Sequence, residues 1–179
     1  MKYLAFDPSI SCTGWVLLQS RDDSLDGVYL AGGYIIPDSR DAPLVERILD
    51  LAKAIGERAR LTAADCITIE TPAATGRNKR AQSFKGTAIT IPVYGAAVGA
   101  CIVAAANGHH CIKIRGVPSD EWTKHRVPST RSDADKAARV AYVQEVYGVG
   151  NMGPKTYAGN VADAALIARW AIWKDRGLV

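Results

Sequence analysis

Residues 3–18 read YLAFDPSISCTGWVLL, and the rest of the predicted structure is organised around this segment. A short apolar run ends on Asp7, a polar turn follows, and a second apolar run begins at Thr13. The pattern predicts a strand, a tight turn and a second strand that returns beside the first. Carboxylate oxygens are preferred ligands of hard divalent cations, so Asp7 at the tip of the first strand is a candidate metal ligand.

The remaining elements follow from alternating and helical patterns of apolar residues. A third strand is predicted at residues 27–36, after a polar hairpin loop at 21–26. The later predicted elements are a helix at 43–60, a strand at 67–70, a helix at 88–106, a strand at 111–115, and helices at 133–147 and 160–175. This order predicts an α/β fold: a five-stranded mixed sheet, made of a three-strand antiparallel meander and two parallel strands, with helices on both faces.

The composition predicts a single domain over residues 1–179, because 48% hydrophobic residues suffice for one well-buried core. A net charge of +4 does not by itself establish a nucleic-acid partner. The four scattered cysteines are Cys12, Cys66, Cys101 and Cys111, and they predict buried thiols in a reducing cytoplasm. The start of the chain does not resemble a signal peptide. Residues 88–106 carry no charge, and we expect a buried helix there rather than a membrane span.

Two later segments bring further oxygen ligands toward Asp7. Glu70 ends the short buried strand at 67–70, and Asn160 and Asp163 are three residues apart. This spacing places the latter two on one face of the last helix, near its predicted first turn. Mg²⁺ or Mn²⁺ held by such ligands keeps waters that substrate phosphate oxygens can replace. The pattern therefore indicates a metal site made by two strand ends and one helix.

Four motifs in order resemble those of the RuvC family of Holliday-junction resolvases. Their spacing is close to that of the family, and together they cover almost the entire chain. They are Asp7-Pro8-Ser9 through Thr13-Gly14, Ile69-Glu70, Ala134-Asp135-Lys136, and Ala162-Asp163-Ala164-Ala165-Leu166-Ile167-Ala168. The resemblance implies a ribonuclease-H-like fold, a homodimer, and magnesium-dependent paired nicking of four-way DNA junctions. A divergent member of this kind fits a phage-sized genome, in which case it would act in the host cytoplasm.

Carried over by position, the resemblance implies that Asp7, Glu70 and Asp163 are metal-binding carboxylates. Asn160 stands where the family usually has a fourth acid, or in some members a histidine. An amide oxygen can coordinate a metal but brings no charge, so this position departs from the family. Lys136 matches the lysine of the family's Ala-Asp-Lys motif and could contact the scissile phosphate. The expected catalytic set is Asp7, Glu70, Asp163, Asn160 and Lys136.

Hydrolysis of a phosphodiester needs an activated water in line with the leaving oxygen. Two ions about 3.5–4 Å apart can stabilise both the attacking and the leaving oxygen. We therefore expect two Mg²⁺ ions per site, with Mn²⁺ able to substitute. Asp7 would bridge them, Glu70 would bind one ion, and Asp163 with Asn160 would bind the other.

Basic residues gather in two segments, which we expect to contact branched DNA. The first segment, residues 77–86, supplies Arg77, Lys79, Arg80 and Lys85. The second supplies Lys124, Arg126, Arg131 and Lys136. A solvated loop is the alternative for each segment.

Other interpretations remain open at this level. Asp7 could cap its turn, Glu70 could be a surface acid, and Asp163 could favour the start of its helix. An acid before a Thr-Gly turn also occurs in nucleotide-binding modules of the actin or sugar-kinase kind. Asn160 leaves room for a third class, a protein that binds junctions without cutting them.

Overall fold

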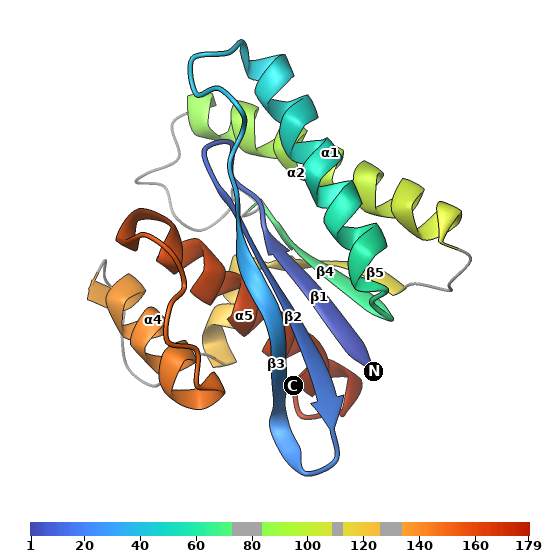
Figure 1. Cartoon of the computed structure of the whole chain (residues 1–179), viewed down its shortest axis with the longest axis vertical. Coiled ribbons are helices and arrows are strands. Elements are labelled where there is room, and N and C mark those ends of the chain that lie inside the picture. The colour runs from blue at the N-terminus through green and yellow to red at the C-terminus, as the bar shows by residue number, and fades with distance from the viewer. Residues whose placement is uncertain (73–83, 109–112, 126–133) are drawn as a thin grey trace.

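The computed structural model describes residues 1–72, 84–108, 113–125 and 134–179, and residues 84–88, 134 and 135 are described by their backbone alone. Its centre is a five-stranded sheet with the order β3-β2-β1-β4-β5 (Figure 1). The strands are β1 (Lys2–Asp7), β2 (Thr13–Arg21), β3 (Ser24–Ile35), β4 (Cys66–Thr71) and β5 (Lys113–Pro118). The first three pair antiparallel, whereas β4 and β5 run parallel to β1. The predicted mixed sheet is confirmed.

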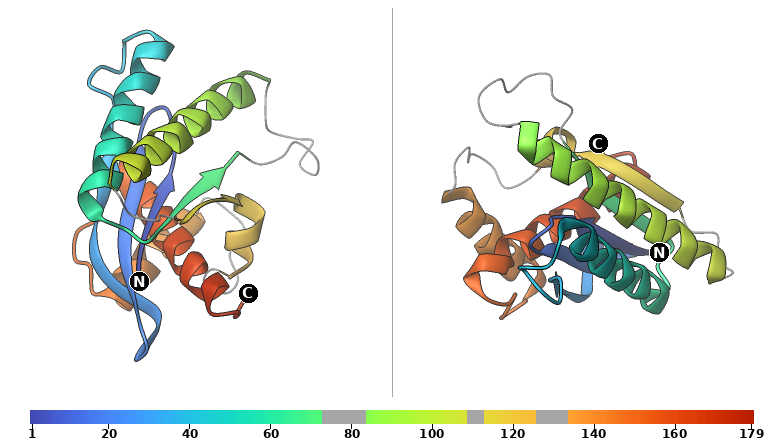
Figure 2. Two further views of the ribbon diagram at one scale, coloured as in Figure 1. Left: turned by 90° about the vertical axis from the view of Figure 1, so that its right-hand side faces the viewer. Right: turned by 90° about the horizontal axis from the view of Figure 1, so that it is seen from above.

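Helices cover both faces of this sheet (Figures 1 and 2). One face carries α1 (Leu44–Thr62) and α2 (Phe84–Asn107). The other carries α5 (Lys155–Asp175), with α4 (Ala134–Tyr147) packed against it, and the short α3 (Ser119–Trp122), which continues into the 3₁₀ turn η1 (Thr123–His125). Near the end of α4, the hydroxyl of Tyr147 donates to the carbonyl of Asp26 at 3.1 Å.

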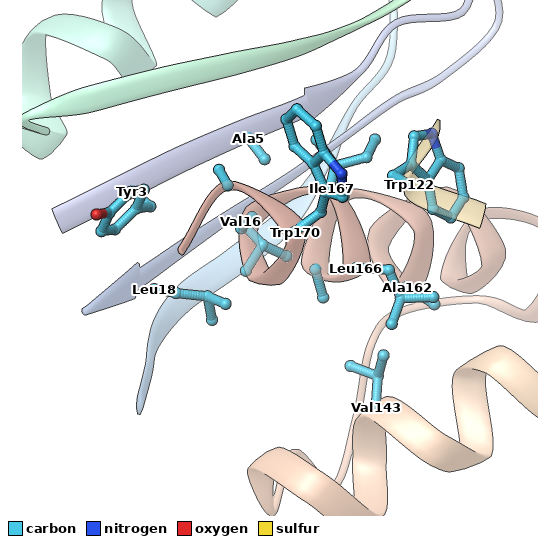
Figure 3. Close-up of a cluster of buried hydrophobic side chains, with 14 of the residues drawn as sticks. Tyr3, Ala5, Val16, Leu18, Trp122, Val143, Ala162, Leu166, Ile167 and Trp170 are labelled. Carbon is cyan, nitrogen blue, oxygen red and sulfur yellow. The ribbon is translucent and has the colours of Figure 1, made fainter. Parts of the chain in front are cut away.

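The side chains of β1 alternate between the two layers, as a period of two requires. Leu4 and Phe6 pack in the core beneath α1 and α2. Tyr3 and Ala5 pack in the core around α5, where Figure 3 shows them with Ile167. Asp7 has the same parity as Tyr3 and Ala5, so its side chain lies on the α5 face of the sheet.

Helix α5 is buried almost all round. Every residue from Ala158 to Ile172 except Asn160 is buried. The helix lies between the sheet and α4 and therefore has little solvent-facing surface. The predicted start at residue 160 was wrong, because α5 begins directly after Pro154, whose fixed φ suits a helix start. Asn160 and Asp163 consequently lie in the second and third turns, away from the positive end of the helix.

Two other expected boundaries also change. The hairpin loop predicted at 21–26 is a turn at Asp22 and Asp23, because Arg21 pairs with Ser24 and both strands extend toward it. β5 extends beyond its predicted end to Pro118, since Val117 and Pro118 continue the pairing with β4. The predicted buried thiols are confirmed for Cys12, Cys66 and Cys101, whereas Cys111 is outside the described residues.

Helix α2 is buried on one face only. Val93, Ala97, Cys101 and Ala104 pack against the core, but Ile102 and Val103 on the opposite face are 53% and 60% exposed. The stretch Ile89–Asn107 is long and apolar enough to cross a membrane, and only 22% of it is buried. One such helix is weak evidence for a membrane span. The expectation of a buried helix therefore holds for one face of α2, and the other is an uncharged apolar surface.

The sheet and α5 approach each other closely at Gly14, the second residue of β2. A Cβ atom at this position would lie 2.0 Å from the backbone oxygen of Asn160 and 2.8 Å from the backbone nitrogen of Val161. Backbone atoms cannot move aside as a flexible side chain can. Glycine at position 14 therefore sets how closely the middle of α5 approaches the strand ends that carry Asp7.

We predict that Gly14→Ala lowers the free energy of unfolding by at least about 2 kcal/mol, because the added methyl group forces α5 away from the sheet. The matched control is Gly150→Ala, since a Cβ there meets nothing within 4 Å. The control should stay within about 0.5 kcal/mol of the wild type. Urea denaturation followed by circular dichroism measures both, and equal midpoints for the two variants would contradict the packing argument.

Candidate active site

The ends of β1 and β4 place Asp7 beside Glu70. The two strands are parallel neighbours, and Phe6 pairs with Ile69, so the next residue of each strand lies at the same level of the sheet. Glu70 has the parity of Cys66, which packs in the core around α5. Both acidic side chains therefore lie on the α5 face, at the carboxyl ends of the parallel strands.

Asp163 approaches the same point from α5. Asp163 is buried. Asp7 and Glu70 are each partly exposed, but protein encloses their carboxyl groups. Burial, followed by repulsion from Asp7, raises the pKa of Asp163 to about 7. Burial, followed by repulsion from Glu70, raises the pKa of Asp7 well above its ordinary value. These mutual effects show that the three predicted carboxylates form one cluster.

Asp7 and Glu70 make ionisation of this part of the site unfavourable. Repulsion from Glu70 adds to burial in raising the pKa of Asp7, and burial raises the pKa of Glu70 as well. A divalent cation held by the two carboxylates would relieve this repulsion.

Two cations of α4 face this cluster. Lys136 lowers the pKa of both Asp7 and Asp163, and its aliphatic chain crosses α5 at Gly159, where a Cβ would lie 3.2 Å from the lysine Cδ. Arg139 binds Asp163 directly: its Nε lies 2.5 Å from Oδ1, and its Nη2 donates to Oδ2 at 3.1 Å. The Nε contact is a close ion pair without hydrogen-bond geometry.

Arg139 was not among the site residues predicted from the sequence. The available signal was its position three residues after Lys136, which puts both cations on one face of α4. That signal was weak, because nothing local indicates that this face is turned toward Asp163.

Asn160 has a contact that its prediction as a metal ligand did not include. Its Nδ2 donates to the backbone carbonyl of Cys12 at 2.8 Å. The amide therefore ties α5 to the turn between β1 and β2. A metal-binding role for Asn160 stays a prediction.

Trp122 of α3 packs in the core, with 4% of its surface exposed. Its side chain lies at the end of the cluster formed around α5 (Figure 3). The indole favours the charged form of Glu70, although its buried Nε1–H has no partner with hydrogen-bond geometry. Trp122 thus brings an unused donor to the neighbourhood of the carboxylates.

Few of the predicted DNA-binding cations can be placed. Lys124 in η1 and Lys136 in α4 are exposed. Lys85 lies in the first turn of α2, where only the backbone is described. The others are outside the described residues: Arg77, Lys79, Arg80, Arg126 and Arg131.

The chemistry of the cluster suits a hard divalent cation in part. Carboxylate oxygens that are enclosed by protein and repel one another are the donors that Mg²⁺ and Mn²⁺ accept. Within the described part of the chain, however, no three side chains of His, Cys, Asp or Glu are arranged as a ready metal site. Asp7 and Glu70 fit an ion as a pair, whereas both oxygens of Asp163 are already in contact with Arg139.

Comparison with known proteins places the fold. No family model and no curated protein matches the sequence. Among solved structures, RuvC from Thermus thermophilus matches with a TM-score of 0.66 and 18% identity, over 99% of this chain and 98% of that one. The yeast mitochondrial Holliday junction resolvase Ydc2 matches with a TM-score of 0.65 and 14% identity, over 97% of this chain and 79% of that one.

A third match is the fowlpox virus resolvase in complex with substrate Holliday junction DNA. It has a TM-score of 0.57 and 9% identity, over 97% of this chain and 98% of that one. All three identities are low, so the likeness is one of fold. The chain has the ribonuclease-H-like fold of RuvC and other Holliday junction resolvases, as its four motifs predicted.

Proposed function

We propose that this chain is a metal-dependent endonuclease that resolves four-way DNA junctions by paired nicks. The observation that carries the proposal is the convergence of Asp7, Glu70 and Asp163 at the carboxyl ends of β1 and β4, facing Lys136 and Arg139. Carboxylates and cations side by side are the groups that phosphodiester hydrolysis needs. The fold supports the same conclusion, since the matched structures are resolvases.

In the proposed reaction, Asp7 and Glu70 would hold Mg²⁺, and Asp163 would complete a site for two ions, with Asn160 as a further oxygen donor. Bound ions supply an activated water and stabilise the charge on the phosphate oxygens. Lys136, exposed on α4 yet close enough to lower the pKa of two of the acids, would donate to a phosphate oxygen. Lys124 and the basic segment at 77–86 would hold the arms of the junction through their phosphates.

Paired nicks need two active sites, so we propose a homodimer. The uncharged face of α2 supports this proposal, because Ile91, Ile102 and Val103 are exposed and Gly95 and Gly99 have open space above them. Small residues between apolar ones let two helices approach closely. An apolar face of this kind on a soluble protein commonly marks a contact surface.

Cleavage of a junction tests the proposed function directly. With Mg²⁺ and a labelled four-way junction, the wild type should nick two opposing strands, and Asp7→Asn should lower the cleavage rate by about a thousandfold or more while junction binding persists. The matched control is Glu57→Gln, an exposed acid on α1, which should cleave as the wild type does. Gel assays of binding and of cleavage measure the two properties separately.

Each failure has a distinct meaning. Junction binding by the wild type without magnesium-dependent cleavage would replace the proposal with a non-cleaving junction-binding protein. Absence of junction binding together with ATP turnover would favour a nucleotide-binding module. Cleavage by Asp7→Asn at the wild-type rate would remove Asp7 from the mechanism.

The acidic cluster predicts how the stability of the protein in EDTA depends on pH. The raised pKa values of Asp7 and Asp163 mean that the folded protein binds protons more tightly than the unfolded chain. The resulting stabilisation is present at low pH and is lost as pH rises from the ordinary value of 3.8 to about 7, the pKa of folded Asp163. At pH 8 the part that comes from Asp163 is gone, and the charged form of Asp163 then repels the neighbouring acids.

Asp7→Asn removes one of the repelling charges. We therefore expect the variant to melt roughly 2–4 °C or more above the wild type at pH 8, a shift that corresponds to about 1 kcal/mol, and to differ less at pH 5. Adding Mg²⁺ at pH 8 should raise the melting temperature of the wild type more than that of the variant. Differential scanning calorimetry gives all of these values, and an equal response to Mg²⁺ in both proteins would count against metal binding at this cluster.

Charged substitutions on α2 test the proposed dimer interface. Replacing Ile102 and Val103 together by glutamate puts charges on the apolar face of α2 and should yield a monomer in sedimentation experiments, with the pairing of nicks lost. Leu25→Glu is the matched control, because Leu25 is equally exposed but lies in the β2–β3 hairpin. A double variant that sediments as the wild type does would show that this face is not the interface.

A further inference from the structure

We propose that Arg139 acts as a resident counter-cation of Asp163, so that the free protein takes one divalent ion, at Asp7 and Glu70, and admits a second at Asp163 only when a DNA phosphate draws the guanidinium away. The inference rests on the proposed nuclease function and specifies how its site is loaded. It assigns a role to a residue that belongs to none of the four motifs.

The geometry of the ion pair is the first argument. Arg139 contacts both oxygens of Asp163, at 2.5 and 3.1 Å, and the two side chains are only 10% and 11% exposed. A guanidinium keeps its charge at all accessible pH values. A divalent ion on the same carboxylate would therefore meet a fixed positive charge at short range in a poorly solvated place.

The acidic cluster is divided into two halves. Asp7 and Glu70 lie at the adjacent ends of two paired strands, whereas Asp163 is paired with Arg139. At the α5 end of the cluster Asn160 contributes no charge, and its amide is bound to the carbonyl of Cys12. A single carboxylate there is balanced by a single guanidinium, so an ion can enter only by replacing Arg139.

A substrate phosphate is the group that would release Arg139 from Asp163. A guanidinium that leaves a carboxylate needs another anion with two acceptor oxygens, and a phosphate offers that geometry. Arg139 lies three residues after Lys136, so both cations face the cluster from one side of α4. A backbone phosphate bound by Lys136 would lie within the reach of Arg139. Substrate binding would then free Asp163 at the time when the second ion is needed.

The experiment counts Mn²⁺ ions bound per chain, by calorimetric titration and electron paramagnetic resonance. The free wild type should bind one ion. A four-way junction built from phosphorothioate strands, which resist hydrolysis, should raise the count to two after subtraction of the DNA alone. Arg139→Gln should bind the second ion without DNA, with an affinity about 10-fold to 100-fold above that of the free wild type.

Two further variants separate this role from a purely structural one. Arg139→Lys keeps the charge but cannot contact both oxygens of Asp163. The free variant should therefore still bind one ion, with an affinity for a second ion that is higher than that of the free wild type. Arg60→Gln removes an exposed cation at the end of α1 and should bind one ion as the wild type does. If Arg139→Gln does not fold, the change of count on adding DNA to the wild type still tests the inference.

The inference is overturned if the free wild type binds two ions with similar affinity, or if the count in Arg139→Gln equals that of the wild type. Either result leaves the nuclease proposal standing as long as the wild type cleaves junctions with Mg²⁺. Failure of every protein to bind Mn²⁺, together with absence of cleavage, would overturn the proposed function itself.

Discussion

The contact between the backbone of β2 and the backbone of α5 determines the geometry of the rest of the molecule. At Gly14 there is no room for a side chain, so the helix lies directly on the strand ends. Small residues of α5 such as Ala162 and Ala165 are fully buried, as close packing of this helix with its neighbours requires. Because α5 is buried almost all round, the position of Asp163 is as well defined as that of a core residue. The cluster therefore combines acids from two strands and a helix at a fixed separation.

This rigidity has an electrostatic cost. Three carboxyl groups are held where protein encloses them, and each makes ionisation of the others less favourable. The chain offsets part of this cost with the cations Lys136 and Arg139. Functional sites commonly retain such unfavourable arrangements because the ligand relieves them. In this protein a divalent cation is the ligand that would do so.

The sequence predicted the parts of the structure that local patterns control. Alternation of apolar residues located the sheet and the strand ends that carry Asp7 and Glu70, and helical spacing put Asn160 and Asp163 on one face. It misplaced the start of α5, because residues 148–159 are glycine-rich and therefore hid the helix-start signal of Pro154. It missed Arg139, since an ion pair between α4 and α5 depends on how two helices pack. The exposure of α2 was likewise invisible, because an apolar helix has the same composition whether it packs on a core or on a second molecule.

Helix α4 has two ends with different attachments. Its last residue, Tyr147, is bonded to the carbonyl of Asp26, whereas its first turns contribute the two cations that face the acids. The acids themselves belong to the sheet and to α5, which cannot shift without disturbing the core. The acids and the cations that balance them therefore come from different elements. Substitutions in α4 can change the charge of the site while the strands and the helix that carry the carboxylates keep their sequence.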